Sequence, residues 1–194
     1  MRCNVGAASR PRWVASRSLL LQRIKSVVKG RGNHHPHQEN LRLGRRSEEG
    51  RAYSVTKCTR TGVLLTDEPS VARTLIDTLF WMDAREKLVL GAFVIMPDHF
   101  HMVASLGKSP LEEIMRQIGS FTARKINEIW GKSGQLWQTG YYDRGIRRSD
   151  DIKQIFDYIH NNPVRKGFVM KPDEWPFSSL KPEHYRKIRW HLFV

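Results

Sequence analysis

Two histidines, His99 and His101, flank a single phenylalanine in the stretch VIMPDHFHMVASL. Side chains alternate across a β-strand, so residues two positions apart share a face. If this stretch is a strand, both imidazoles lie together on one face, while Phe100 points into the core from the other. Two neighbouring imidazoles suit a shared divalent cation. The pair is a weak signal by itself, because histidines with this spacing also occur at unrelated polar strand positions.

Tyr158 and Asn162 could complete such a site from the segment DDIKQIFDYIHNNPVRKGFV. The isoleucines and the phenylalanine of this segment form one apolar stripe of a helix, and Tyr158 lies roughly 110° from its centre. Asn162 follows four residues later, on the same flank. A phenol is a nucleophile and an amide oxygen suits a hard cation, so the constellation fits phosphoryl transfer. The simpler alternative is that Tyr158 packs at a helix edge and Asn162 ends the helix before Pro163.

Hydrophobic periodicity predicts the elements that must position these residues. The run 87–96 is almost continuously apolar, and Pro97-Asp98 favours a turn into the strand that carries the histidines. Ser149-Asp150 suits the start of the last helix, and Pro163 its end. The expected order is a strand over 51–60, a helix over 69–84, strands over 87–96 and 99–106, a helix over 110–130, a strand over 142–148 and a helix over 150–162. This order predicts an α+β fold, a ferredoxin-like βαββαβ sheet with helices on one face and a further C-terminal helix that carries Tyr158.

The chain is strongly basic, with 194 residues, a net charge of +14 and a pI of about 10.2. Such a charge favours a polyanionic partner. Residues 1–50 hold 11 Lys or Arg against 3 Asp or Glu, so we expect a disordered basic extension there, in which Trp13 to Val28 could form an amphipathic helix. Residues 51–180 are predicted to form the folded domain, and residues 181–194 a tail.

Two cysteines far apart in the sequence form neither a disulfide framework nor a metal finger. This usage favours a reducing interior. No apolar run approaches the about 18 residues that identify a transmembrane helix, so we expect no membrane partner.

Five motifs occur in the order MPDHFHMV, SFTARKIN, LWQ, DYIHNNPVRKGFV and WPFSS. Together they resemble the single-tyrosine HUH transposases, in the branch of the REP-associated tyrosine transposases. The resemblance covers roughly residues 51–180 and leaves residues 1–50 without a counterpart. Five motifs in register are far more specific than any one of them. The resemblance implies that the folded domain is an HUH catalytic domain with a ferredoxin-like core.

The resemblance also implies a role for each residue of the site. His99 and His101 would bind Mg²⁺ or Mn²⁺ with Asn162 as the third ligand, and Tyr158 would attack the DNA backbone. Attack leaves a 5′-phosphotyrosine and a free 3′-hydroxyl, so strands can be rejoined without an external energy source. The implied partner is single-stranded DNA with hairpin elements. The protein would act as a monomer or homodimer in the bacterial cytoplasm, at the nucleoid.

Cationic and aromatic residues near the motifs are candidate DNA contacts. The set is Arg116, Arg124, Lys125, Trp137, Gln138, Arg144, Arg147, Arg148, Arg165 and Lys166. The cations would contact phosphates, and Trp137 with Gln138 would contact an unpaired base. Each cation could equally be a solvated surface charge, and Trp137 could equally be a core residue.

Tyr141 and Tyr142 are rival tyrosines for the nucleophile. As adjacent strand residues they would point to opposite faces of the sheet, and neither has an amide partner at helical spacing. His160 lies about 160° around the helix from Asn162 and is not expected to be a ligand.

Three alternative functions are open. A βαββαβ sheet also serves RNA-recognition domains, which bind without catalysis, but this chain places histidines where those domains expose aromatics. A metal-dependent hydrolase unrelated to DNA would need more acidic ligands near the histidines than Asp98. A domesticated, inactive transposase is the third alternative, and the presence of His99, His101, Tyr158 and Asn162 argues against decay of the site.

Overall fold

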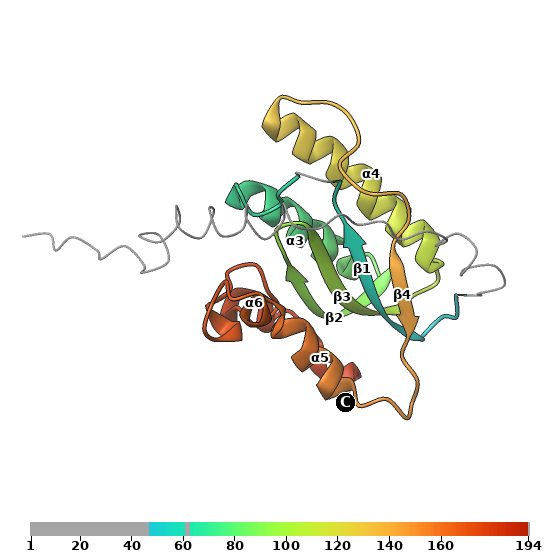
Figure 1. The fold of residues 1–194 in the computed structure, drawn as a ribbon. Helices are drawn as coiled ribbons and strands as arrows, with labels where there is room; N and C mark the ends of the chain where they lie inside the picture. The colour runs from blue at the N-terminus through green and yellow to red at the C-terminus, as the bar shows by residue number, and fades with distance from the viewer. Residues whose placement is uncertain (1–46, 61–62, 194) are drawn as a thin grey trace, which may run out of the picture.

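The computed structural model describes residues 47–60 and 63–193, and it confirms the predicted α+β fold. Four antiparallel strands form one sheet in the order β2-β3-β1-β4, which is the ferredoxin-like order (Figure 1). The strands are β1 (Ala52–Cys58), β2 (Leu88–Ile95), β3 (His99–Leu106) and β4 (Tyr142–Gly145); the helices are α3 (Pro69–Ala84), α4 (Leu111–Trp130), α5 (Ile152–His160), α6 (Asn162–Arg165) and α7 (Pro182–Tyr185), with 3-10 turns η2 (Pro172–Glu174) and η3 (Trp190–Leu192).

The central strand β3 separates its side chains onto two faces, as the alternation predicts. The turn from β2 closes with a hydrogen bond from the Met96 N–H to the His99 carbonyl, at 2.8 Å. On one face Phe100 and Met102 are fully buried. On the other face His101 lies between its register partners Thr56 of β1 and Val94 of β2. The register therefore fixes the face to which each histidine is presented.

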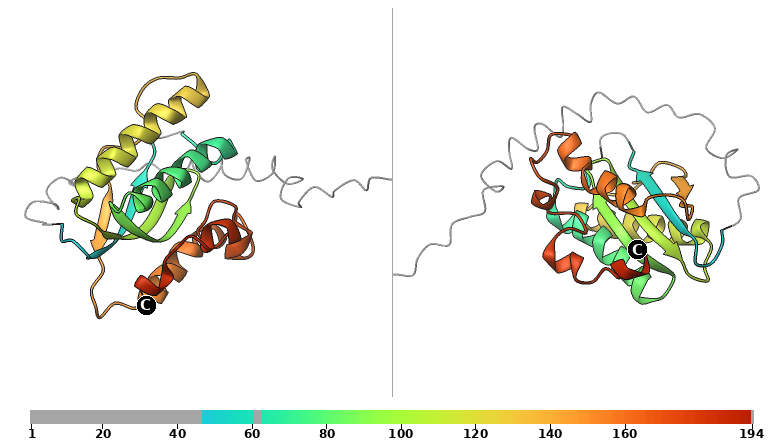
Figure 2. Two further views of the ribbon diagram at one scale, coloured as in Figure 1. Left: turned by 180° about the vertical axis from the view of Figure 1, so that it is seen from behind. Right: turned by 90° about the horizontal axis from the view of Figure 1, so that it is seen from below.

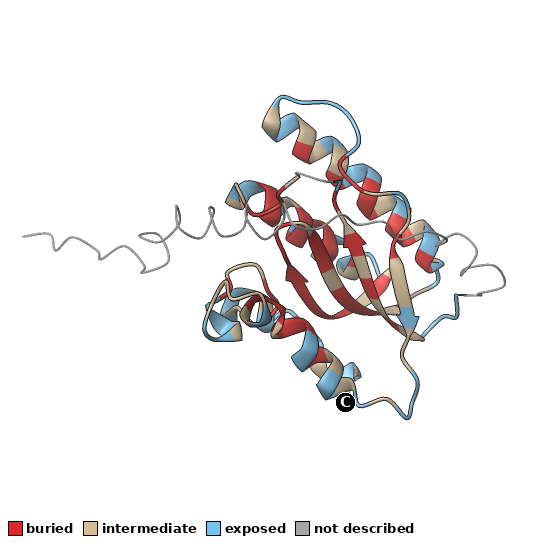
Figure 3. Cartoon of the chain, viewed as in Figure 1, coloured by how far each residue is buried: buried red, intermediate tan, exposed pale blue. Residues whose placement is uncertain are grey.

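Helical layers cover both faces of the sheet (Figure 2). Helices α3 and α4 pack on the face that buries Phe100, and together they enclose the larger core. Helix α5 packs on the opposite face, mainly against β2 and β3, where Phe156 and Trp175 join Val94 and Val103 in a second core. Figure 3 shows that β2 and β3 are largely buried, whereas β4 is intermediate to exposed. The second face is therefore covered over β2 and β3 and more open towards β4.

The C-terminal helix differs from the prediction at both ends. It begins at Ile152, because the Asp151 carboxylate caps it by accepting the Gln154 N–H at 3.1 Å. It ends at His160, but Pro163 does not stop the helical path. Pro163 occupies the first turn of α6, where a backbone N–H would have no partner within the helix, so a proline is tolerated there. The strand predicted over 142–148 is also shorter and ends at Gly145.

The segment predicted as a C-terminal tail packs onto the domain over its described residues, 181–193. Ile188 is buried in the larger core, and the Arg189 guanidinium lies 2.8 Å from the Asp83 carboxylate at the end of α3. Trp190 and Phe193 each make an edge-to-face contact with Phe156 of α5. This segment therefore supports the helix that carries Tyr158, rather than hanging free of it.

The described part of the chain begins within the predicted basic extension. Ser47 Oγ accepts the Leu111 N–H at 3.1 Å, and the Gly50 N–H donates to the Leu106 carbonyl at 2.8 Å, so residues 47–50 are joined to the domain. The predicted helix from Trp13 to Val28 lies outside the described residues. Among the residues described, no helix is both long and apolar enough to cross a bilayer.

Phe100 gives a direct test of which β3 face is the core. Its ring is fully buried and contacts the Trp137 ring edge-to-face at a centroid distance of 5.6 Å. We expect Phe100→Ala to lower the free energy of unfolding in urea by about 3–5 kcal/mol, because it removes a buried ring and leaves a cavity. Phe121→Ala is the control, since that ring is 41% exposed. A smaller loss for Phe100→Ala than for Phe121→Ala would contradict this assignment.

Candidate active site

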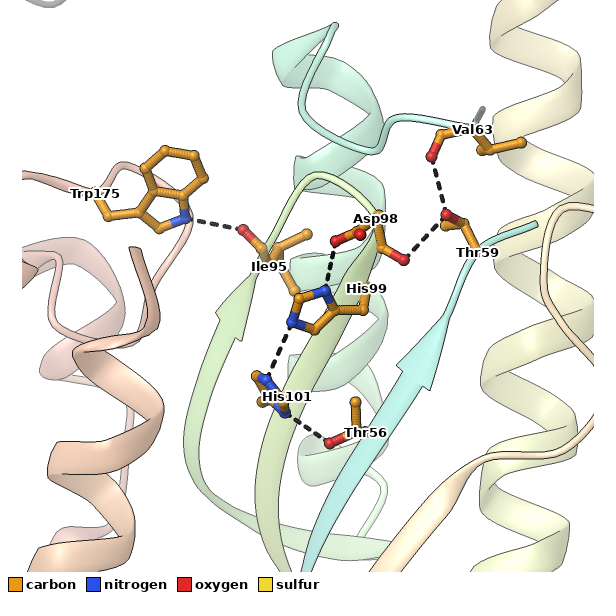
Figure 4. Close-up of polar contacts among 8 residues, drawn as sticks. All are labelled: Thr56, Thr59, Val63, Ile95, Asp98, His99, His101 and Trp175. Carbon is orange, nitrogen blue, oxygen red and sulfur yellow. Dashed lines mark hydrogen bonds and ion pairs between the residues drawn. The ribbon is translucent and has the colours of Figure 1, made fainter. Parts of the chain in front are cut away.

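His99 and His101 converge on the β3 face that α5 partly covers (Figure 4). Their Nε2 atoms are 3.1 Å apart. The other nitrogen of each ring also has a polar neighbour: His99 Nδ1 is 2.6 Å from Asp98 Oδ1, and His101 Nδ1 is 2.7 Å from Thr56 Oγ1. The four side chains therefore form one continuous hydrogen-bonded row, from the β2–β3 turn to β1.

The row is satisfied by two neutral imidazoles. If the Thr56 hydroxyl donates to His101 Nδ1, then His101 Nε2–H donates to His99 Nε2, and His99 Nδ1–H donates to the Asp98 carboxylate. A hydroxyl can also accept, so Thr56 permits the other tautomer of His101, in which Nε2 carries a lone pair. Both Nε2 lone pairs can then point to the same place.

These residues fit a divalent cation. Burial lowers the pKa of His101 to about 3, with the charges of His99 and Arg165 adding to the shift and that of Asp98 opposing it, so the ring is neutral at physiological pH. Two Nε2 atoms 3.1 Å apart can bind one ion, and each ring is held through its Nδ1 atom, as in metal sites with an outer shell of acceptors.

The histidine pair needs further ligands of another type. Over residues 47–60 and 63–193, no group of three or more His, Cys, Asp or Glu side chains could hold a metal ion. Oxygen ligands would therefore have to come from an amide, from water or from a substrate phosphate. Asn162 is the amide that the sequence predicted for this purpose.

Tyr158 lies on the exposed flank of α5, and its side chain is 55% exposed. The helical path continues beyond His160, because the Arg165 N–H donates to the Asn161 carbonyl at 2.9 Å. Asn162 is buried one turn beyond Tyr158, and its Nδ2 donates to the Tyr158 carbonyl at 3.3 Å. This bond uses the amide nitrogen and leaves the amide oxygen, the atom that a cation needs, as an acceptor. The two residues therefore share a flank, as the spacing predicted.

Buried polar contacts attach α5 and the following segment to the sheet. The Trp175 indole N–H donates to the Ile95 carbonyl at 2.9 Å, at the end of β2 (Figure 4). His160 Nε2 lies 2.7 Å from Ser179 Oγ, which also accepts the Phe93 N–H at 3.0 Å. His160 is thus a packing residue, and the prediction that it is not a metal ligand agrees with its position. These contacts determine where Tyr158 stands above the sheet.

Arg165 connects the tyrosine to the histidines. Its guanidinium carbon lies over the Tyr158 ring, 4.6 Å from the centroid. After burial and His99, its charge contributes to the lowered pKa of His101. Arg165 therefore lies within electrostatic range of both groups.

The other tyrosines near the site occupy different faces, as predicted from their adjacency. Tyr141 is buried in the larger core, on the side of α3 and α4. Tyr142 is the register partner of Thr56, which is in turn the partner of His101. Cross-strand partners share a face, so Tyr142 stands on the histidine face, two strands away.

The remaining candidate DNA contacts fall into two groups. Three cations lie on α4, beyond the sheet from the histidines: Arg116 paired with Glu113, Lys125 paired with Glu128, and Arg124 over the Phe121 ring. The others follow α4 in the chain: Arg144 on β4, paired with Asp150 at 3.1 Å, then Arg147 and Arg148 in the exposed connection to α5, then Arg165 and Lys166 at the end of α6. Register places Arg144 on the histidine face, through its partner Ser54, and Arg165 lies over the Tyr158 ring. Arg147 and Arg148 follow Gly145, at the end of β4 that lies away from His101.

Trp137 is a core residue in this structure. Its side chain is 5% exposed, its indole N–H donates to Thr122 Oγ1 at 3.0 Å, and its ring contacts Phe100. The prediction that this ring stacks on an unpaired base does not fit such burial. Gln138 is half-buried, and its backbone N–H donates to the Cys58 carbonyl at 3.0 Å.

Sequence reasoning missed the residues that hold the histidines. Asp98 was considered for a turn and as a lone acidic ligand but not as the partner of His99, and Thr56 had no assigned role, since its pairing with His101 spans 45 positions. A carboxylate directly before a candidate metal histidine is a usable signal. The Thr56 contact has no local signal, because strand register alone creates it.

The geometry defines an α+β domain whose ferredoxin-like sheet presents a histidine pair beside a helix with an exposed tyrosine. The chain belongs to the family described as "Transposase IS200 like", whose model matches residues 55–162. It is similar to a REP-associated tyrosine transposase of Escherichia coli K12, with 29% identity over 93 residues, covering 47% of this chain and 53% of that protein. It is also similar to a putative REP-associated tyrosine transposase of Haemophilus influenzae, with 30% identity over 102 residues, covering 46% and 57%.

The chain spans about half the length of the curated relatives it matches. One solved structure, a REP-associated tyrosine transposase bound to a REP hairpin, has a TM-score of 0.61 and 23% identity, and covers 74% of this chain and 85% of that one. At this identity the match establishes the shared fold.

The buried His160 makes the stability of the fold depend on pH. Burial lowers its pKa from 6.5 to about 4, although Asp157 opposes the shift. As the pH falls below the unfolded value, the unfolded chain takes up a proton that the native chain does not, so acid favours unfolding until the folded pKa is passed. We expect this residue alone to lower the free energy of unfolding in urea by about 1–2 kcal/mol between about pH 7 and about pH 5.

His160→Gln is the control for this pH dependence, because its amide can contact Ser179 without titrating. His101 acts in the same direction, since burial lowers its pKa too. The slope of stability against pH should therefore become shallower in His160→Gln without disappearing. Equal slopes for the two proteins would show that His160 is not the titrating group.

Proposed function

We propose that this protein is a metal-dependent transposase of the tyrosine HUH type, which cleaves and rejoins single-stranded DNA beside hairpins. The observation that supports it most directly is the placement of an exposed Tyr158 on a helix that packs over the strand carrying His99 and His101. Family membership favours DNA strand transfer as the reaction. The relatives and the fold match, named for REP elements and in one case bound to a REP hairpin, favour hairpin DNA as the substrate.

Tyr158 is the nucleophile in this proposal. Its Oη attacks the scissile phosphorus, an Oη–P bond forms and the P–O3′ bond breaks. The phenol loses its proton, the departing 3′-oxygen gains one, and the 5′ end stays bound as a phosphotyrosine. A 3′-hydroxyl of another strand can then attack the phosphotyrosine, which restores the phenol and joins the strands. The number of phosphoester bonds is conserved, so no energy source is required.

His99, His101 and Asn162 would hold the divalent cation, Mg²⁺ or Mn²⁺. When bound, the cation would supply Lewis-acid polarisation of the scissile phosphate. Asp98 and Thr56 orient the two imidazoles through their Nδ1 atoms. A single strand can reach this site, because the sheet face is open towards β4.

The nucleophile is tested by removing one oxygen atom. Tyr158→Phe keeps the ring, which is mostly exposed, so the fold should survive. The variant should form no covalent adduct with hairpin-bearing single-stranded DNA in Mn²⁺, when the reaction is analysed on a denaturing gel. Peptide mapping of the wild-type adduct should place the DNA on the peptide IFDYIHNNPVR.

Tyr142→Phe is the matched control, because Tyr142 is the other tyrosine on the histidine face. It should retain the adduct. An adduct that maps to Tyr142 would refute the assignment of the nucleophile while leaving the reaction in place. Failure of the wild-type protein to form an adduct with any hairpin substrate would favour the non-catalytic binding module.

The metal site is tested in two stages. Replacing both His99 and His101 by Ala should abolish cleavage but leave hairpin binding in a gel-shift assay, since the phosphate contacts lie elsewhere. Asp98→Asn keeps the size of the side chain and removes the charge that orients His99, so Mn²⁺ affinity, measured by calorimetry, should fall by about 10–100-fold. Cleavage that persists in the double variant, or in excess chelator, would rule out this site.

A further inference from the structure

Three side chains of one helical flank point to a site for a single phosphate. Tyr158, Asn162 and Arg165 are spaced four and three residues apart on the nearly continuous path of α5 and α6. Gly167, at a φ of 68°, ends this path directly after Lys166. The backbone that carries Arg165 is therefore held in place on both sides, and its side chain reaches back over the Tyr158 ring.

Arg165 has no carboxylate partner, unlike two other cations of the domain. Arg144 is paired with Asp150, and Arg51 with Glu48, each within hydrogen-bonding range of a carboxylate. Arg165 forms no ion pair and no side-chain hydrogen bond within residues 47–60 and 63–193. Its guanidinium instead contacts the face of an aromatic ring, which leaves its N–H donors available for an anion.

The position of this guanidinium matches the position of the reacting group. A phosphodiester attacked by Tyr158 Oη must lie next to that ring and close to the histidine pair. Arg165 lies 4.6 Å from the ring centroid, and α5, which carries that ring, contacts the histidine strand β3. A planar fork of N–H donors suits the two non-bridging oxygens of such a diester.

We propose that Arg165 is a catalytic residue that binds the non-bridging oxygens of the scissile phosphate and holds it against Tyr158. The inference rests on the proposed function. In this role the guanidinium neutralises charge on the phosphate as the Oη–P bond forms, and its contact with the ring keeps the phenol aligned. Arg165 thereby provides a positive charge next to Tyr158, whereas the two histidines lie on β3.

Variants of Arg165 can distinguish the effect of its charge from the effect of its packing on the Tyr158 ring. Arg165→Met keeps an apolar stem against the Tyr158 ring but has no charge. It should slow single-turnover adduct formation by about 100–1,000-fold, the usual effect of losing one pre-placed donor, with hairpin affinity changed by less than about threefold. Arg165→Lys should recover part of the rate. Arg73→Ala, an exposed cation on α3 beyond the sheet, should match wild type.

A substrate change tests the contact itself. A methylphosphonate at the cleaved step carries no negative charge. Neutralisation of charge by Arg165 can therefore no longer increase the rate. The rate difference between wild type and Arg165→Met should then shrink to less than about tenfold, and added guanidinium should accelerate Arg165→Met on the normal diester.

Three results would overturn the proposal. If wild type forms the Tyr158 adduct and Arg165→Met reacts at the same rate, Arg165 has no part in the reaction, although the proposed function stands. If the defect of Arg165→Met is equally large on the methylphosphonate, its role is packing only. If wild type forms no adduct at all, the proposed function and this inference are both lost.

Discussion

The packing of α5 onto the open face of the sheet is the contact on which the rest of the site depends. A strand face that carries both histidines and Val103 is half polar and half apolar. Phe156 and Trp175 cover the apolar half together with Val94, and the Trp175 N–H satisfies the last carbonyl of β2. Because the helix is held through its apolar stripe, the flank roughly 110° from the centre of that stripe is left uncovered, and Tyr158 lies there.

The polar interactions on this sheet face mainly orient the two imidazoles and contribute less to the stability of the fold. Asp98 and Thr56 each hold one imidazole through Nδ1, so both Nε2 atoms meet within 3.1 Å. Such a row is expensive to desolvate unless every member is paired, and in this structure each ring nitrogen has a partner. The burial that lowers the pKa of His101 also keeps that ring neutral, the state in which an imidazole can accept a cation.

The C-terminal segment also helps to hold α5 in place. Trp190 and Phe193 pack on Phe156, the Phe193 ring also lies against Gly91 of β2, and Ser179 joins His160 to β2. Helix α5 is therefore held both by the sheet and by residues that follow it in the chain. A short helix of this kind gains most of its stability from such packing rather than from its own hydrogen bonds.

The sequence by itself determined the class of fold and the main residues of the candidate site. Period-two alternation in 99–106 separated the histidines from Phe100, and helical spacing placed Tyr158 beside Asn162, because both patterns are local. Tertiary structure alone decided that Trp137 is a core residue and that residues 181–193 support α5, since burial depends on distant partners. It also decided that Thr56 holds His101 and that Arg165 lies over Tyr158. These contacts arise from strand register and from the nearly continuous helical path through Pro163, and neither can be read from residue types in sequence order.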